Sequence, residues 1–202
     1  MTVSKGRMEL SLRGVGGSDC VNYVEPIRDP KKVEDISIYL RRQSERNYIM
    51  FILGIYTGLR ISDILRFKIK DVKNKDYVNI REVKTGKQKI FQINATIKKE
   101  LKLYCEGKDL NEYLIKSREG DNSPICRTMA YKIIREAGEY YGITNLGTHS
   151  MRKTFGYHFY LQYKDIVTLQ KIYNHADPSI TLHYIGIEQA AINNKIKNFK
   201  IY

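Results

Sequence analysis

The sequence predicts a mainly α-helical domain with one small antiparallel β-sheet, an α+β fold. Apolar residues recur at helical spacing through most of the chain, and Asp-Pro pairs or glycines mark several segment ends. One pair of short segments alternates apolar and polar residues, as strands do. At 202 residues, the chain is long enough to bury a substantial core in one or two domains.

The first predicted elements are helices. Asp29 and Pro30 are typical of a helix start, with Asp at the cap and Pro at the first helical position. A second, strongly apolar helix is predicted from about Asn47 to Thr57, and Gly58 is typical of its end. Arg60 therefore lies just past a helix end, before a short helix.

The predicted sheet is a single hairpin. Residues 77–83 and 87–93 alternate in the manner of strands, and Lys84-Thr85-Gly86 would form the bend between them. After residue 94 we expect only helices and loops. An apolar stripe over residues 130–141 predicts one of these helices.

The C-terminal helices carry conspicuous polar residues. Thr148 is a plausible cap for a helix in which His149 and Arg152, three residues apart, share one face. Two short helices should follow, one from Asp165 to about Asn174 and one that begins at Asp177-Pro178 and ends at Tyr184. One apolar face of the final segment is formed by Ile192, Ile196 and Phe199.

The charge balance indicates a polyanionic partner. Lys and Arg number 35 against 22 Asp and Glu, which gives a formal net charge of +13. Such an excess favours nucleic acid before membrane, although a merely solvated basic surface would give the same count. The sequence has no apolar run of transmembrane length and no apolar stretch of a signal peptide at its start.

The cysteines and histidines argue against a disulfide framework and against a metal site. Cys20, Cys105 and Cys126 are odd in number and widely spaced, which suits a reducing, cytoplasmic setting. His175 and His183 form the close histidine pair, and no acidic or thiol residue accompanies them at ligand spacing. We therefore expect neither a metal nor another cofactor.

Six residues along the chain form a set suited to gripping and attacking a phosphate. Two guanidiniums, one lysine and two imidazoles could hold phosphate oxygens, and a phenol could attack phosphorus. In chain order they are Arg60, Lys84, His149, Arg152, His175 and Tyr184. Their contexts are Thr-Gly-Leu-Arg, Lys-Thr-Gly-Lys and His-Ser-Met-Arg, then a histidine and a tyrosine nine positions apart.

In this order and spacing, the set resembles the catalytic residues of the tyrosine recombinase (phage integrase) family. The resemblance runs from about Asp29 to Phe199. It implies the catalytic-domain fold of that family over residues 29–202, with residues 1–28 as a tail or linker. The N-terminal clamp domain that full-length members usually carry has no counterpart before Asp29, so the chain is either a short relative or a fragment.

The resemblance also implies a role for each residue. Arg60, Arg152 and His175 would hold the scissile phosphate, and His149 would donate a hydrogen bond or act as a general base. Tyr184 would be the nucleophile, giving a 3′-phosphotyrosyl bond without metal or ATP. Lys84 would be the general acid, and Asp63 would orient Arg60 or tune a histidine.

Several of these assignments depend on the family pattern alone. Sixteen tyrosines occur in the chain, and only the spacing from His175 selects Tyr184. Lys84 has Lys87 and Lys89 as rivals, and simple helix capping is an alternative for Asp63. Members commonly have glycine where this chain has Asn174, which tolerates the same left-handed backbone.

The predicted function is therefore that of a site-specific DNA recombinase or integrase acting on double-stranded DNA. One alternative is a type IB topoisomerase, which uses the same chemistry to relax supercoils. Another is a non-catalytic DNA-binding protein on the same fold. The resemblance further implies a tetramer on synapsed DNA, in which the final segment docks on a neighbouring protomer. Packing of that segment on its own domain is an equal alternative.

Overall fold

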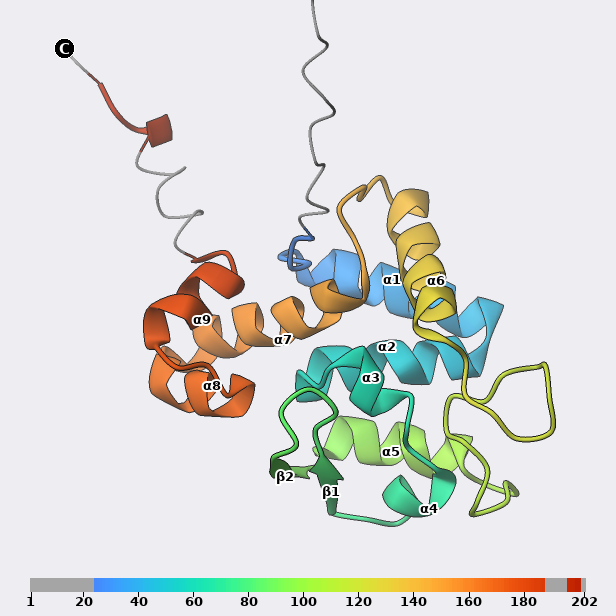
Figure 1. Ribbon diagram of the computed structural model, residues 1–202. Coiled ribbons are helices and arrows are strands. Elements are labelled where there is room, and N and C mark those ends of the chain that lie inside the picture. The colour runs from blue at the N-terminus through green and yellow to red at the C-terminus, as the bar shows by residue number, and fades with distance from the viewer. Residues whose placement is uncertain (1–23, 188–195, 201–202) are drawn as a thin grey trace, which may run out of the picture.

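The computed structural model of the protein describes residues 24–187 and 196–200. Its helices and the two strands of one sheet form the predicted mainly α architecture (Figure 1). The helices are α1 Pro30–Gln43, α2 Glu45–Thr57, α3 Ile61–Ile64, α4 Ile69–Val72, α5 Ala95–Tyr104, α6 Arg127–Tyr140, α7 Thr148–Tyr163, α8 Ile166–Tyr173 and α9 Pro178–Tyr184.

The central element of the main core is α2, which packs against α1, α5 and α7 (Figure 1). Every residue from Ile49 to Gly54 is buried, because this helix is apolar around most of its circumference. Gly54 allows the close approach of α7, since a Cβ there would lie 2.7 Å from the Cβ of Met151. Met151 precedes Arg152, so this contact places one catalytic candidate against the core.

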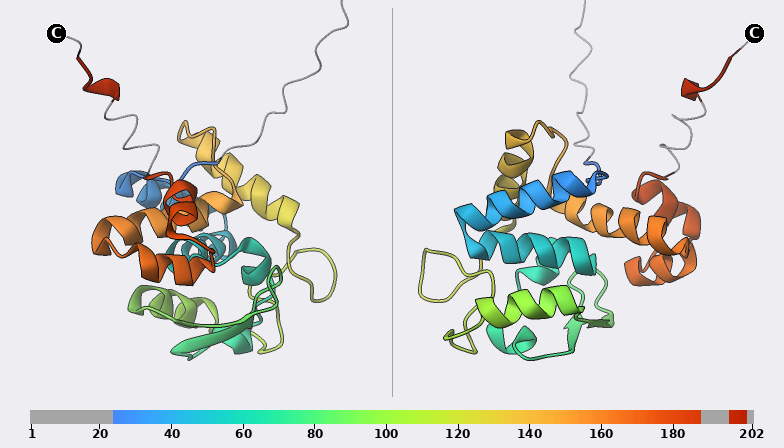
Figure 2. Two further views of the ribbon diagram at one scale, coloured as in Figure 1. Left: turned by 60° about the vertical axis from the view of Figure 1, so that its left-hand side comes forward. Right: turned by 180° about the vertical axis from the view of Figure 1, so that it is seen from behind.

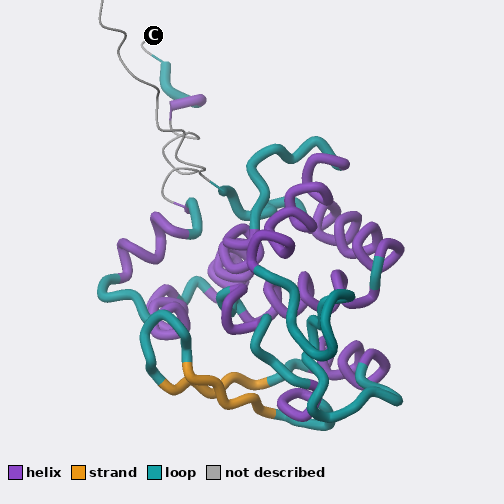
Figure 3. Tube along the Cα trace, turned by 45° about the vertical axis from the view of Figure 1, so that its right-hand side comes forward, coloured by secondary structure: helices purple, strands orange, loops and turns teal. Residues whose placement is uncertain are grey.

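The strands β1 Tyr77–Arg81 and β2 Gln88–Gln92 pair antiparallel, as predicted, although both are shorter than the alternating segments (Figure 3). The register pairs Tyr77 with Gln92 and Arg81 with Gln88. One face of the hairpin packs on the main core through Val78, which is buried. The connecting residues 82–87 carry the predicted bend, and Lys87 donates a hydrogen bond to Asn174 at the end of α8.

A second, smaller core lies beneath α8, α9 and the last turns of α7. Its buried residues are Leu169, Tyr173 and Ile185, with Phe155 and Phe159 packed against them. In Figure 2, α8 and α9 lie together at the far end of α7, to one side of the remaining helices. The helix that ends at Tyr184 is therefore built on a core separate from the one around α2.

Local capping explains why most predicted helix boundaries are confirmed. Asp29 caps α1 by accepting a hydrogen bond from the Lys31 amide, with Pro30 in the first turn. Gly58 and Asn174 end α2 and α8 in the left-handed conformation, with φ of 61° and 58°. These side chains and backbone angles allow the unpaired backbone groups at the helix ends to form hydrogen bonds locally, without contacts from distant parts of the chain.

One sequence-based expectation about a helix cap is wrong. Thr148 is the first residue of α7 and not its cap. Gly147 is the cap, and the Ser150 hydroxyl accepts a hydrogen bond from the Gly147 amide at 3.1 Å. A Cβ at Gly147 would be crowded, because it would lie 3.1 Å from Val24 Cγ1 and 3.0 Å from Tyr131 Cε2. Residues 24–28, part of the predicted tail or linker, contact α7, where the Ile27 amide donates to Thr154 Oγ1 at 2.8 Å.

Within residues 24–187 and 196–200, no helix is long and apolar enough to cross a membrane. The same residues contain no group of three or more His, Cys, Asp or Glu side chains that could hold a metal ion. In the final segment, Ile196 and Phe199 are 68% and 73% exposed, whereas Ile192 lies outside the described residues.

Candidate active site

Arg60 is positioned by the end of α2. Gly58 turns the chain in the left-handed conformation, so that Arg60 becomes the N-cap residue of α3 with its side chain directed inward, 16% exposed. Its Nη1 lies 2.9 Å from Oε2 of the buried Glu82. That pair lacks the alignment of a hydrogen bond, so the buried Nη1 retains an unused donor.

Glu82 balances the charge of Arg60 in this structure. Burial raises the pKa of this carboxyl, but the hydrogen bond from Thr85 Oγ1 (2.7 Å) and the Arg60 guanidinium outweigh it, and the net pKa is lowered. Glu82 therefore stays ionised at neutral pH. It ties the start of the hairpin loop to the helix end that carries Arg60.

Asp63 has a different partner from the predicted ones. Its Oδ1 accepts a hydrogen bond from the Val83 amide at 3.0 Å, which fixes the position at which the chain leaves β1. Its Oδ2 is buried without a hydrogen-bond partner. Asp63 therefore positions the loop that carries Lys84, the residue that follows Val83.

The buried side-chain atoms without a hydrogen-bond partner cluster in this part of the molecule. Among the described residues they are Arg60 Nη1, Asp63 Oδ2 and Glu82 Oε1. Buried polar atoms are nearly always paired, so such a cluster indicates a place where a bound group or water completes the hydrogen bonding. Arg60 Nη1 can donate to an anionic ligand, whereas the two carboxylate oxygens can only accept hydrogen bonds from water or from a donor group.

The three candidate lysines of the hairpin differ in their surroundings. Lys84 is exposed on the turn between the strands. Lys87 Nζ donates to Asn174 Oδ1 at 3.1 Å, and Lys89 Nζ donates to the Ile172 carbonyl at 2.8 Å. Of the three, Lys84 is the one without a hydrogen bond to the end of α8.

Lys89 is a partly buried cation that the sequence analysis named only as a rival to Lys84. Burial, with the positive charges of Arg152 and Arg60, lowers its pKa to about 8. Its bond to the Ile172 carbonyl joins β2 to the last turn of α8. Cations at a helix C-terminus are favourable because the final carbonyls have no partners within the helix.

Arg152 is nearly fully buried, with 2% of its surface exposed. Nη1 donates to the Gly58 carbonyl, and Nη2 donates to the Tyr173 carbonyl at 3.1 Å. The guanidinium carbon lies 4.2 Å from the centre of the Tyr173 ring. Arg152 thus connects the end of α2, the end of α8 and its own helix α7 at one point.

His149 lies one turn before Arg152 on the same face of α7, as predicted. Its side chain is exposed, but desolvation by the surrounding protein lowers the pKa of the imidazole, and the neighbouring positive charges lower it further: Arg152, Lys153, Arg60 and Lys84. His149 is therefore neutral at pH 7 and can accept a proton. This electrostatic setting fits a general base better than a cationic donor.

His175 lies just after the Asn174 turn, and its ring is held by α9. Nδ1 is 2.9 Å from Oγ1 of Thr181, a fully buried residue. Burial and the charges of Arg152 and Arg60 lower its pKa, so the ring is neutral at pH 7. When the Thr181 hydroxyl donates to Nδ1, the proton is on Nε2, which can then donate to a ligand.

Tyr184 is the last residue of α9 and is partly buried. Burial raises the pKa of its phenol, and the positive charges of Arg152 and Arg60 oppose this increase. Its ring meets the His175 ring edge-on, with centroids 5.4 Å apart. The structure therefore brings five predicted residues into one electrostatic neighbourhood, with Lys84 on the adjoining turn.

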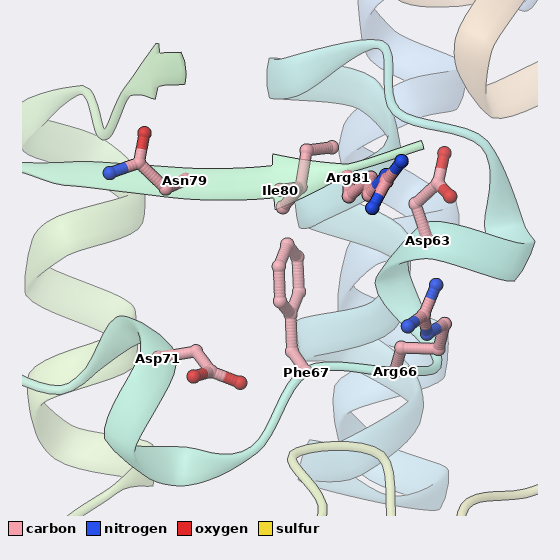
Figure 4. Close-up of a pocket in the computed structure, with 7 residues that line it drawn as sticks. All are labelled: Asp63, Arg66, Phe67, Asp71, Asn79, Ile80 and Arg81. Atoms are coloured by element: carbon pink, nitrogen blue, oxygen red, sulfur yellow. The ribbon is translucent and has the colours of Figure 1, made fainter. Parts of the chain in front are cut away.

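A hollow of about 150 Å³ adjoins this neighbourhood on the other side of Asp63, and Figure 4 shows the side chains around it. None of the six predicted catalytic residues lines the hollow. The lining residues are Asp63, Arg66, Phe67, Asp71, Asn79, Ile80 and Arg81. Acidic and basic groups face it together, so it has no net preference for an anion.

Sequence reasoning missed Glu82, Thr181 and the role of Tyr173. Glu82 meets Arg60 across 22 positions of sequence, and Tyr173 meets Arg152 across 21. The spacing of apolar residues in a sequence does not predict contacts between polar side chains that are this far apart. A carboxylate two residues before Lys84 was the one available signal for Glu82.

Comparison with known proteins identifies the family. The phage integrase family profile matches residues 28–190. The chain is 45% identical over 179 residues to the probable integrase/recombinase YoeC of Bacillus subtilis, covering 89% of this chain and 98% of that protein. The chain belongs to the phage integrase family. The predicted class of enzyme, a tyrosine recombinase that breaks and rejoins DNA strands, is confirmed at the level of the family.

More distant relatives extend this result. The tyrosine recombinase XerA of Pyrococcus horikoshii is 26% identical over 159 residues, which cover 77% of this chain and 55% of XerA. A crystal structure of XerA recombinase superposes with a TM-score of 0.67 at 23% identity, covering 88% of this chain and 67% of that one. A lambda integrase tetramer bound to a Holliday junction gives a TM-score of 0.64 at 16% identity, covering 80% and 48%. These two structures confirm the predicted catalytic-domain fold.

Proposed function

We propose that this chain is a site-specific recombinase in which Tyr184 cleaves one strand of double-stranded DNA and forms a 3′-phosphotyrosyl bond. The observation that carries the proposal is the grouping of Tyr184 with His175, whose ring centroid lies 5.4 Å away, and with Tyr173, whose ring lies 4.2 Å from the Arg152 guanidinium carbon. Two neutral imidazoles, His149 and His175, complete the same neighbourhood.

In the cleavage step, the Tyr184 oxygen attacks the scissile phosphorus. A bond from Oη to phosphorus forms, and the bond from phosphorus to the 5′-oxygen breaks. The phenol proton passes to a base, a role that we assign to the neutral His149, and the leaving 5′-oxygen takes a proton from Lys84. One phosphate ester replaces another, so religation by the 5′-hydroxyl needs no ATP.

The pentacoordinate phosphorane carries more negative charge on its non-bridging oxygens than the substrate does. Arg60 and Arg152 supply guanidinium donors whose orientation is fixed before DNA binds, by Glu82 in one case and by the carbonyls of Gly58 and Tyr173 in the other. Preorganised donors of this kind lower such a barrier by roughly 2.7–4 kcal/mol each. His175 adds a further donor through Nε2.

The partner is double-stranded DNA, and the catalytic unit on DNA is a tetramer. The net charge of +13 suits phosphate contacts. The similar lambda integrase has been seen as a tetramer bound to a Holliday junction. Exposure of Ile196 and Phe199 favours docking of the last segment on a neighbouring protomer over packing on its own domain.

Deletion of residues 188–202 tests this assembly step. The expected result is a folded, DNA-binding protein of unchanged melting temperature that no longer forms multimers on DNA in a native gel. Loss of the folded state on deletion would instead show that the segment packs on its own domain.

A covalent trapping assay tests the cleavage step. The protein is incubated with a nicked suicide DNA that carries its site, in EDTA, and a denaturing gel shows any protein–DNA adduct. Tyr184→Phe should abolish the adduct, whereas Tyr163→Phe, which alters an exposed tyrosine at the end of α7, should leave it. An adduct that persists in Tyr184→Phe moves the nucleophile elsewhere, and no adduct on bound cognate DNA indicates a non-catalytic binder.

A further inference from the structure

Tyr173 lies at the centre of the site although the cleavage scheme gives it no role. It is fully buried at the end of α8, and each part of the residue contacts Arg152. The ring lies 4.2 Å from the guanidinium carbon, the carbonyl accepts from Nη2 at 3.1 Å, and the phenol donates to the Arg152 carbonyl. Tyr173 therefore contacts both the guanidinium and the backbone carbonyl of Arg152.

The same ring contacts two more members of the set. Its centroid lies 5.4 Å from that of His175 and 5.5 Å from that of Tyr184, and the Tyr184 contact is edge-on at 79°. A movement of the Tyr173 ring would therefore shift Arg152, His175 and Tyr184 relative to one another. Positional errors of about 1 Å in such groups can reduce a rate by roughly 100-fold.

A glycine on α7 provides the space that this arrangement needs. A Cβ at Gly156 would overlap the Tyr173 hydroxyl, and it would lie 2.9 Å from the Tyr173 Cζ and 2.6 Å from Ile185 Cγ2. Gly156 is four residues after Arg152, on the same face of the helix. A helix interior disfavours glycine, so its presence here is explained by the phenol that it accommodates.

Tyr173 is not itself a candidate nucleophile. Its hydroxyl is already engaged with the Arg152 carbonyl. Burial raises the pKa of this phenol well above its ordinary value, although Arg152 opposes the increase. Its contribution must therefore come through the residues around it.

We propose that Tyr173 is a positioning residue for strand cleavage, seated against Gly156, and that it sets the Arg152 guanidinium against Tyr184. This inference rests on the proposed function of Tyr184. Tyr173 supplies a fixed aromatic surface and a fixed acceptor for Arg152, so the guanidinium is directed at the phosphate before DNA arrives.

The test uses four variants of the full chain: Tyr173→Phe, Tyr173→Leu, Gly156→Ala and the double variant Gly156→Ala/Tyr173→Leu. Gly156→Ala alone should lower the melting temperature, because its methyl overlaps the phenol. The double variant should recover much of that loss, since the shorter leucine leaves room for the methyl and for rotation of Ile185. If the double variant recovers its melting temperature, slower cleavage by it cannot be attributed to loss of the folded state.

Cleavage is then measured in a single turnover on DNA that is already bound, over a range of pH. Tyr173→Phe loses one hydrogen bond, and we expect cleavage roughly 2- to 10-fold slower. The double variant also loses the aromatic surface under a desolvated cation, and we expect a decrease of roughly 30-fold or more. Its pH–rate profile should shift to higher pH, because a displaced Arg152 stabilises the Tyr184 phenolate less.

The outcomes separate this inference from the function on which it rests. Absence of an adduct with the unaltered chain on bound cognate DNA contradicts the proposed function. An adduct with the unaltered chain, together with a double variant that is folded and cleaves at the unaltered rate, overturns the role of Tyr173. A rate lowered equally at every pH also overturns it, because that result indicates only a structural contribution.

Discussion

Lys89 provides a prediction whose size can be worked out from the structure. Its pKa is lowered from 10.5 to about 8, chiefly by burial. A base whose pKa is lower in the folded state holds fewer protons there than in the unfolded chain between these two values. The free energy of unfolding should therefore rise with pH through this window, and the full penalty applies below pH 8.

The expected change follows from linkage. A shift from 10.5 to about 8 corresponds to about 3.4 kcal/mol of penalty at low pH. Between about pH 7 and pH 10, about 2.5 kcal/mol of that penalty should disappear. In Lys89→Met, which keeps the apolar stem, this contribution is absent, and other titrating groups cancel when the two proteins are compared.

The assay is urea unfolding of the unaltered chain and Lys89→Met at a series of pH values from 7 to 10. The free energy of unfolding of the unaltered chain should rise relative to the variant by about 2.5 kcal/mol over this range. Lys89→Arg serves as the control, because a guanidinium remains charged throughout. A difference between unaltered chain and Lys89→Met that stays constant with pH would refute the reasoning.

Three further predictions concern separate parts of the molecule. Gly54→Ala should lower the free energy of unfolding by about 1–3 kcal/mol in urea, because the methyl meets Met151 at 2.7 Å and overpacks the core. Thr181→Val should slow cleavage of bound DNA roughly 2- to 10-fold by removing the hydroxyl at His175 Nδ1, whereas Thr181→Ser should not. If about six to ten phosphates are contacted, affinity for DNA should fall roughly 10³- to 10⁵-fold between about 50 and 200 mM salt.

Each of these has a result that would contradict it. Unchanged stability in Gly54→Ala would mean that α2 and α7 can separate without cost. Equal cleavage by the valine and serine variants would show that the Thr181 hydroxyl does not fix the His175 tautomer. A DNA affinity that is nearly independent of salt would count against phosphate contacts.

Much of the fold could be predicted because helix ends are determined locally. Asp29, Gly58 and Asn174 each end or begin a helix through their own side chain or backbone angle. The cap of α7 could not be predicted in this way. Val24 and Tyr131 lie close to Gly147 from other parts of the chain and leave little room for a Cβ there.

The candidate site also has a part that could be predicted from the sequence and a part that depends on contacts between distant residues. Its six residues could be selected because their order matched a known family pattern, and the structure brings five of them together. The contacts that hold them could not be predicted, because Glu82, Lys89 and Tyr173 act across elements that are far apart in sequence. Burial also determines their charge states, and burial is a property of the whole fold.

The small core beneath α8 and α9 has a consequence for how the two halves of the site come together. Arg60 is held by the main body, and Tyr184 is held by a cluster built on Leu169, Tyr173 and Ile185. Segments with few buried contacts open at a lower free-energy cost than a central helix such as α2. Opening of α8 and α9 would therefore displace Tyr184 and His175 and remove the Tyr173 contacts of Arg152, while Arg60 and its partner Glu82 stay folded with the main body.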